Sequence, residues 1–266
     1  MDAIVNARFY GAKPYQAAVI HGGPGALGTV AAIARELSKD YGVMEPLQTK
    51  NSIAELLQEL DDIISATCDG PISLIGHSWG AWLGFIYAAE YSEKVKKLIL
   101  VGSGPFEIEY VAEIDQNRMK HLTQPEITQY YALLTALDAE ETKNKDQLMQ
   151  QLGGLVEKAD NFCAVEIETD HDECFPVCGD MYSTIWAEAS ELREKGKLLA
   201  LADKITCPVV IIHGEHDPHP LDGVRVPLEK RIKDLRIHSL KKCGHNPWKE
   251  KYARALFYEI LRKEMG

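Results

Sequence analysis

The sequence lacks any long hydrophobic run, because its longest apolar stretch, around residues 81–89, is about half of the roughly 20 residues that a membrane-spanning helix needs. The first residues also lack the order of a basic segment followed by an apolar segment that is typical of a signal peptide. The 6 cysteines show no spacing of a disulfide framework, which indicates a reducing compartment. We therefore expect a soluble, acidic, cytoplasmic protein that does not bind membranes.

Basic charge is also scarce, with 29 Lys and Arg against 40 Asp and Glu and a net charge of −11. A nucleic-acid-binding surface of clustered basic residues is therefore not expected. The sequence has no phosphate-binding loop and no dinucleotide fingerprint, so we expect no cofactor. The 266 residues, of which 45% are hydrophobic, are enough for a globular protein of one or two domains.

The negative charge is concentrated in the middle of the chain. Residues 105–207 hold 21 acidic and 9 basic residues, a net charge of −12, whereas the remainder holds 19 and 20. This contrast indicates two compositional units. The acidic unit is interpreted either as a solvated helical surface or as a cover over a site that receives a cationic group, and both interpretations stay open.

Short apolar runs alternate with helical patterns. Strands are predicted over residues 17–20, 72–75, 97–101, 209–213 and 235–240. Helices are predicted over residues 52–67, 82–91, 108–137, 182–201 and 248–264. This order indicates an α/β protein with a mostly parallel central sheet, helices on both faces and a helical insertion after the strand at 97–101.

The most informative motif is Gly76-His77-Ser78-Trp79-Gly80, a G-x-S-x-G pattern between a predicted strand and a predicted helix. Such a turn lifts the serine hydroxyl clear of the sheet, and its glycines avoid collisions with neighbouring backbone. The helix that follows places its N-terminal amides beside developing negative charge. A glycine turn without catalytic function is the alternative, but the strand and helix around the motif favour Ser78 as a nucleophile.

A serine nucleophile needs a basic histidine that is oriented by a carboxylate. Asp217 follows the strand predicted at 209–213, and His245 follows the strand that ends at 240. Both residues would lie at the carboxyl edge of the sheet, in the order serine, acid, histidine. The sequence therefore predicts Ser78, Asp217 and His245 as catalytic residues.

A second glycine-rich turn, His21-Gly22-Gly23-Pro24-Gly25, follows the first predicted strand. Its backbone N–H groups can approach a reacting carbonyl oxygen, so the amides of Gly23 and Trp79 are the predicted oxyanion hole. His21 is interpreted as a structural residue of this turn. The alternative is a glycine-proline turn that binds no ligand.

The combination of HGGPG, GHSWG, GEHDP and CGHNP resembles the α/β-hydrolase superfamily, and its first two motifs most resemble the proline iminopeptidase group. The resemblance implies an eight-stranded core, here residues 1–104 and 206–266, with a helical cap over residues 105–205. It also implies the same three catalytic residues. Residues 44–50 depart from the Asp-x-Arg-Gly loop that is usual in the iminopeptidases. The 20 residues before HGGPG are too few for two full strands and their turn, which predicts a trimmed sheet edge.

These observations predict a serine hydrolase that cleaves a small ester or amide through an acyl-enzyme intermediate. In the iminopeptidases, acidic cap residues hold the free amino terminus of the substrate, so an aminopeptidase acting on small molecules or short peptides is one interpretation. Glu166, Glu168 and Trp186 are candidate substrate-binding residues. A carboxylesterase for uncharged acyl esters and a non-catalytic receptor for a small ligand are the alternatives. The acidic and cysteine-containing segment 171–178 lacks a second pair of ligands, so no metal site is expected. The sequence carries no signal for the oligomeric state.

Overall fold

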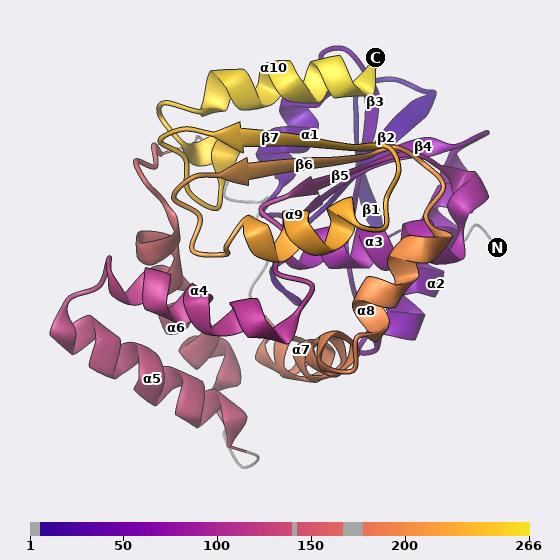
Figure 1. Ribbon diagram of the computed structural model, residues 1–266. Coiled ribbons are helices and arrows are strands. Elements are labelled where there is room, and N and C mark those ends of the chain that lie inside the picture. Colours follow the sequence, from indigo (N-terminus) through magenta and orange to yellow (C-terminus); the bar gives the residue numbers. More distant parts are fainter. Residues whose placement is uncertain (1–5, 140–142, 167–177) are drawn as a thin grey trace.

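The computed structural model describes residues 6–139, 143–166 and 178–266. Within this part of the chain, a seven-stranded sheet has the order β1-β3-β2-β4-β5-β6-β7. Only β1 runs antiparallel to its neighbour (Figure 1). The strands are β1 (Ala7–Tyr10), β2 (Tyr15–Ile20), β3 (Gly42–Pro46), β4 (Ile72–His77), β5 (Val95–Val101), β6 (Val209–Gly214) and β7 (Leu235–Leu240). The predicted mostly parallel sheet is confirmed.

Helices cover both faces of the sheet because alternate side chains of the central strands point to opposite sides. Leu74 belongs to the core cluster that includes residues of α2, α3, α7, α8 and α9, whereas Ile75 belongs to the cluster with α1 and α10. The helices are α1 (Ala31–Leu37), α2 (Ile53–Thr67), α3 (Trp79–Glu90), α4 (Val111–Met119), α5 (Gln124–Asp138), α6 (Lys145–Asp160), α7 (Gly179–Glu194), α8 (Lys197–Ala200), α9 (Asp222–Glu229) and α10 (Arg254–Met265). No helix in the described ranges is long and apolar enough to cross a membrane.

The insertion between β5 and β6 is helical, as predicted, and α5 to α7 form its cap region. Helices α5 and α6 share a small apolar cluster that includes Leu133, Leu137 and Leu152. The boundaries of the cap at residues 105 and 205 stay predictions. The cap lies over the carboxyl ends of the strands, where sites in open α/β sheets are usually found.

Two helices that the sequence predicts as continuous are divided. The segment predicted as 108–137 breaks between α4 and α5, where Thr123 and Glu126 form a capping box and a proline occupies the first turn of α5. Proline fits there because its missing N–H is not needed in a first turn. The segment predicted as 182–201 breaks between α7 and α8 at Gly196, which has φ 67°.

The N-terminal edge of the sheet is trimmed, as the sequence predicts. The resemblance implies eight strands, but the described part of the chain has seven. The residues before HGGPG do hold two strands, β1 and β2, because β1 is only 4 residues long. The final helix begins later than predicted, at Arg254, because Pro247 starts a separate short 3-10 turn.

Candidate active site

The turn that carries Ser78 joins β4 to α3, as the sequence predicts. Ser78 has φ 53° and ψ −116°, a conformation that is strained for a residue with a side chain. A Cβ at Gly76 would collide with the carbonyl oxygen of Gly80, and a Cβ at Gly80 would collide with that of Ile20. Both glycines are therefore required. The turn places Ser78 on the wall of a cavity of about 340 Å³.

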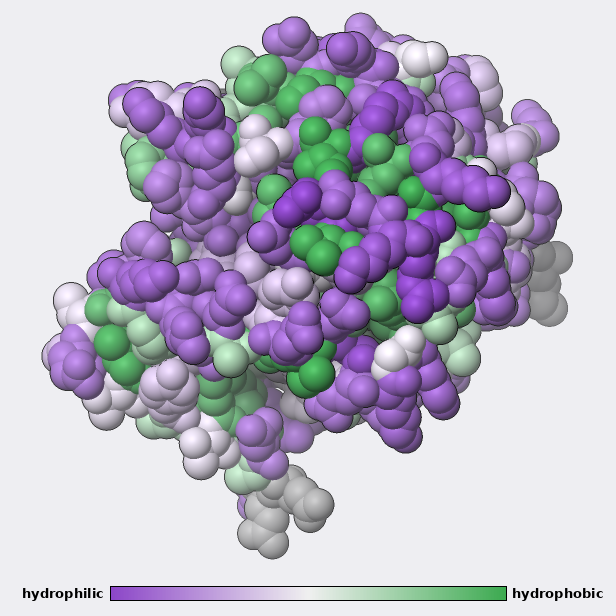
Figure 2. All heavy atoms as spheres, viewed as in Figure 1, coloured by the Kyte–Doolittle hydropathy of each residue, from purple (hydrophilic) through white to green (hydrophobic). Residues whose placement is uncertain are grey.

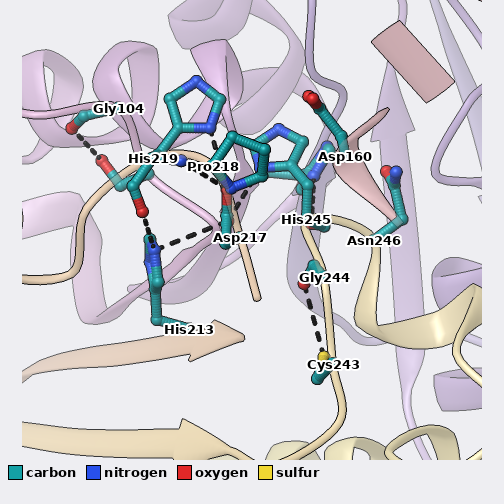
Figure 3. A network of polar contacts seen from close by, with 12 residues as sticks. Gly104, Asp160, His213, Asp217, Pro218, His219, Cys243, Gly244, His245 and Asn246 are labelled. Atoms are coloured by element: carbon teal, nitrogen blue, oxygen red, sulfur yellow. Dashed lines mark hydrogen bonds and ion pairs between the residues drawn. The ribbon is translucent and has the colours of Figure 1, made fainter. Parts of the chain in front are cut away.

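His245 and Asp217 form a buried pair beside this turn, on the loops that follow β7 and β6. The Nδ1 atom of His245 lies 2.8 Å from Oδ2 of Asp217 (Figure 3). Burial on its own would lower the pKa of His245, but the charge and hydrogen bond of Asp217 outweigh burial and raise it. For Asp217 burial acts in the opposite direction and on its own would raise the pKa. The charges of the histidines that face this carboxyl outweigh burial and hold its pKa well below its usual range. The pair is thus a carboxylate and an imidazole that it stabilises in the charged form.

A second imidazole, that of His219, is hydrogen-bonded to the other oxygen of the same carboxylate. Oδ1 of Asp217 lies 2.9 Å from both the backbone N and the Nδ1 of His219. The rings of His219 and His245 stack with their centroids 4.5 Å apart. Burial is the largest cause that lowers the pKa of His219, to about 4. Sequence reasoning gave His219 no role, although its position two residues after Asp217 was the available signal.

The glycine-rich turn after β2 lines the same cavity as these histidines. Gly23 has φ 55°, and both Gly23 and Trp79 line the cavity together with Ser78. His21 is fully buried, and burial lowers its pKa to about 4. Its Nδ1 lies 3.0 Å from the carbonyl oxygen of Gly22, which agrees with the structural role that the sequence suggests.

The cap supplies most of the apolar wall of the cavity. Trp186 stacks on Trp82 with ring centroids 5.8 Å apart and on Tyr182 at 6.2 Å. The further apolar and aromatic residues of the cap that line the cavity are Ile114, Tyr130, Leu134, Met149, Leu152 and Val156. Trp186, a candidate substrate-binding residue, thus lines the cavity from α7 of the cap, with its ring against α3.

Two ion pairs account for the charged cap residues in this wall. Arg118 of α4 binds Asp160 of α6 through two bonds, Nε to Oδ1 at 2.7 Å and Nη2 to Oδ2 at 2.8 Å. Lys249 binds Glu157 at 2.6 Å. Asp160 also lies near His219 and His245, with ligand atoms within 4.8 Å of one another. The guanidinium of Arg118 already neutralises this carboxylate, so the arrangement does not favour a metal cation.

The buried carboxylate of Glu250 fixes the loop that carries His245. It accepts hydrogen bonds from the backbone N–H groups of Phe162, Cys163 and Gly244 at 2.7, 2.7 and 2.8 Å. The backbone N–H of His245 also donates to the carbonyl oxygen of Asp160 at 2.7 Å. Glu250 therefore joins the segment after α6 directly to the histidine loop.

Comparisons with known proteins agree with this architecture. Residues 19–252 match the family described as alpha/beta hydrolase fold. The chain belongs to the α/β-hydrolase family. It is 26% identical over 254 residues to a 2-hydroxy-6-oxononadienedioate/2-hydroxy-6-oxononatrienedioate hydrolase of Cupriavidus pinatubonensis, which covers 88% of this chain and 82% of that protein.

Among solved structures, this α/β hydrolase is similar to VinJ, with a TM-score of 0.69, 17% identity and coverage of 97% of this chain and 93% of VinJ. It is also similar to a proline iminopeptidase of Mycobacterium smegmatis, with a TM-score of 0.62, 21% identity and coverage of 97% and 94%. At these identities the two likenesses concern the fold alone.

Glu166, one of the two acidic candidates for substrate binding, does not line the cavity of this α/β hydrolase. Glu166 is exposed and lines a surface groove of about 550 Å³ that adjoins the cavity, since Glu157 and Lys249 line both. Glu168 lies outside the described residues. The prediction that both carboxylates face a bound substrate therefore has no support from the described part of the cap.

Proposed function

We propose that this α/β hydrolase is a serine hydrolase that cleaves a small ester or amide through an acyl-enzyme intermediate. The observation that carries the proposal is the strained turn of Ser78, which lines the same cavity as His245, the imidazole that Asp217 orients. Ser78 attacks the substrate carbonyl, and His245 accepts the proton and returns it to the leaving group. Asp217 stabilises the imidazolium that forms.

The oxyanion of the tetrahedral intermediate would lie between the turn after β2 and the start of α3. The backbone N–H groups of Gly23 and Trp79 are the proposed donors. Preorganised donors of this kind each stabilise the transition state by about 3 kcal/mol. Water then hydrolyses the acyl-enzyme with His245 as the general base.

The cavity favours an uncharged, apolar acyl group. Its cap wall is mostly apolar and aromatic. Its two cap carboxylates, Glu157 and Asp160, are each paired with a basic residue. A substrate ammonium would compete with those pairs, so an ester of an apolar acid fits this site better than a free amino terminus. The leading interpretation is therefore a carboxylesterase.

An aminopeptidase of the proline iminopeptidase type is the second candidate. It is supported by the HGGPG and GHSWG motifs and by the similar fold of the mycobacterial iminopeptidase. A panel of short-chain p-nitrophenyl esters and aminoacyl naphthylamides, including the prolyl one, separates the two candidates. Faster cleavage of the esters is expected, and a preference for the naphthylamides would favour the aminopeptidase.

The nucleophile is tested with a fluorophosphonate probe and two serine variants. Ser78→Ala should abolish labelling and lower kcat by at least about 10³-fold. Ser73→Ala is the matched control, because Ser73 is a buried residue of β4, the strand before Ser78, and it does not line the cavity. Labelling that persists in Ser78→Ala would refute the proposal. Tight ligand binding without turnover of any substrate would indicate a receptor instead.

A further inference from the structure

Asp217 binds the Nδ1 atoms of two imidazoles, although the proposed mechanism uses only one. Oδ2 lies 2.8 Å from Nδ1 of His245, and Oδ1 lies 2.9 Å from Nδ1 of His219. The Nε2 of His213 is more distant, at 3.5 Å from Oδ2. A carboxylate only accepts hydrogen bonds, so both Nδ1 atoms carry a proton. In the neutral rings the two Nε2 atoms are therefore acceptors. Figure 3 shows the rings side by side, extending to the same side of Asp217.

The Nε2 of His219 has no hydrogen-bond partner among the described residues, and His219 lines the same cavity as Ser78. This ring cannot turn away easily. Its Nδ1 is bound to Asp217, its backbone carbonyl oxygen lies 2.7 Å from Nε2 of His213, and one ring face stacks on His245. Because burial lowers its pKa to about 4, the ring is neutral at ordinary pH. The cavity thus contains a fixed acceptor.

The groups around this acceptor restrict the ligand that it can bind. A cationic donor is disfavoured, because Arg118 and His245 both lie close enough to lower the pKa of His219. An anion is disfavoured, because Nε2 presents a lone pair and the carboxylates of Asp160 and Asp217 lie close by. A neutral donor, such as a hydroxyl or an amide N–H, fits the site.

We propose that His219 is a specificity-determining residue whose Nε2 accepts a hydrogen bond from a neutral hydroxyl or amide N–H of the substrate, within a few bonds of the scissile carbonyl. The proposal rests on the serine hydrolase function proposed above. A substrate without such a donor would cover Nε2 and leave it unpaired, which is unfavourable for a buried acceptor. The matched hydroxylated substrate should therefore be preferred by at least about fivefold.

Two variants separate the acceptor from the bond to Asp217. His219→Asn keeps an N–H donor near the position of Nδ1 but removes the acceptor at Nε2. His219→Gln places an amide oxygen near Nε2 but removes the donor to Asp217. His216→Asn is the matched control, because His216 is exposed and stacks on Phe162 outside the cavity.

The readout is the ratio of kcat/KM within pairs of esters that differ by one hydroxyl. The pair of p-nitrophenyl butyrate and p-nitrophenyl 3-hydroxybutyrate tests the acyl side of the substrate. The pair of ethyl butyrate and 2-hydroxyethyl butyrate tests the alcohol side. The protein should prefer the hydroxylated member of at least one pair. In His219→Asn the ratio of kcat/KM for the hydroxylated ester to that for its partner should fall to about one. In His219→Gln and His216→Asn the ratio should stay as in the unchanged protein. Equal rates in both pairs, or a preference that survives in His219→Asn, would overturn the inference.

A binding measurement separates this inference from the proposed activity. The dissociation constants of 2-pentanone and 4-hydroxy-2-pentanone are measured by NMR titration of the Ser78→Ala protein, which needs no turnover. Tighter binding of the hydroxyketone that is lost in the Ser78→Ala, His219→Asn double variant supports the role of His219, even if no ester is cleaved. Equal binding of the two ketones, or binding of neither, counts against it.

Discussion

The ion pair between Arg118 and Asp160 offers a quantitative test of how the cap is held together. The guanidinium makes two bonds to the carboxylate, and the side chains are only 15% and 1% exposed. Burial on its own would lower the pKa of Arg118, but Asp160 raises it. Replacing Arg118 by Met leaves a buried carboxylate without its partner. Breaking a buried pair in this way costs about 3–5 kcal/mol of the free energy of unfolding.

For a chain of this size, that loss corresponds to a decrease in Tm of roughly 10 °C. The paired replacement Arg118→Met with Asp160→Leu removes both charges, so its loss should be much smaller than that of Arg118→Met alone. Arg225→Met is the surface control, because Arg225 pairs with the exposed Asp222, and it should cost less than about 1 kcal/mol.

Urea unfolding followed by circular dichroism measures all of these variants. The reasoning fails if Arg118→Met lowers the free energy of unfolding by less than about 1 kcal/mol, because an unpaired buried carboxylate destabilises a protein by more than that. It also fails if the paired replacement is as destabilising as the sum of its two single changes. Either result would mean that water reaches Asp160 and that the cap is looser than its contacts indicate.

Three further predictions follow from the pKa shifts and contacts. Because His245 must be neutral to act as a base and Asp217 raises its pKa, kcat/KM should rise with pH through a value above 6.5. Asp217→Asn should shift this limb to lower pH and reduce kcat on the order of 10⁴-fold, whereas a flat profile would contradict the assignment. Glu250→Gln should lower the free energy of unfolding by about 2 kcal/mol, because the carboxylate of Glu250 accepts three backbone hydrogen bonds. It should also lower kcat, whereas the exposed control Glu259→Gln should change neither quantity. Glu166→Gln should change KM neither for free-amine substrates nor for uncharged substrates, since the carboxylate of Glu166 is exposed. A rise in KM for the amines alone would support a role of Glu166 in substrate binding.

The loops of the site were predictable because their chemistry is local. The turn around Ser78 needs glycine on both sides, and the collisions that a Cβ would cause at Gly76 and Gly80 show why. Asp217 and His245 each follow a short apolar run, and such runs form buried parallel strands. Motif and strand order together are therefore enough to indicate the candidate residues.

The elements that were missed lack a clear periodic pattern. Strand β3 contains Glu45, whose charge interrupts the apolar run, yet Glu45 is fully buried because Tyr10 donates a hydrogen bond to it at 2.8 Å. Helix α1 has only 7 residues, and α6 contains the pair Gly153 and Gly154, which argues against a helix. In each case tertiary contacts outweigh a weak local preference.

The acidity of the cap shows why a net charge does not predict the charge of a site. The sum of −12 over residues 105–207 is consistent with a cap that covers a site for a cationic group, one of the two interpretations of the sequence. Where the structure describes the cap, several carboxylates instead form ion pairs on its surface, as Glu126 does with Lys158 and Glu191 with Lys195. In Figure 2 the part of the surface over α4 and α5 is a mixture of hydrophilic and hydrophobic residues. Asp160 does face the cavity, but Arg118 neutralises it. The electrostatics of the cavity therefore depend on which residues pair, and pairing between α4 and α6 is a property of the tertiary structure that composition cannot contain.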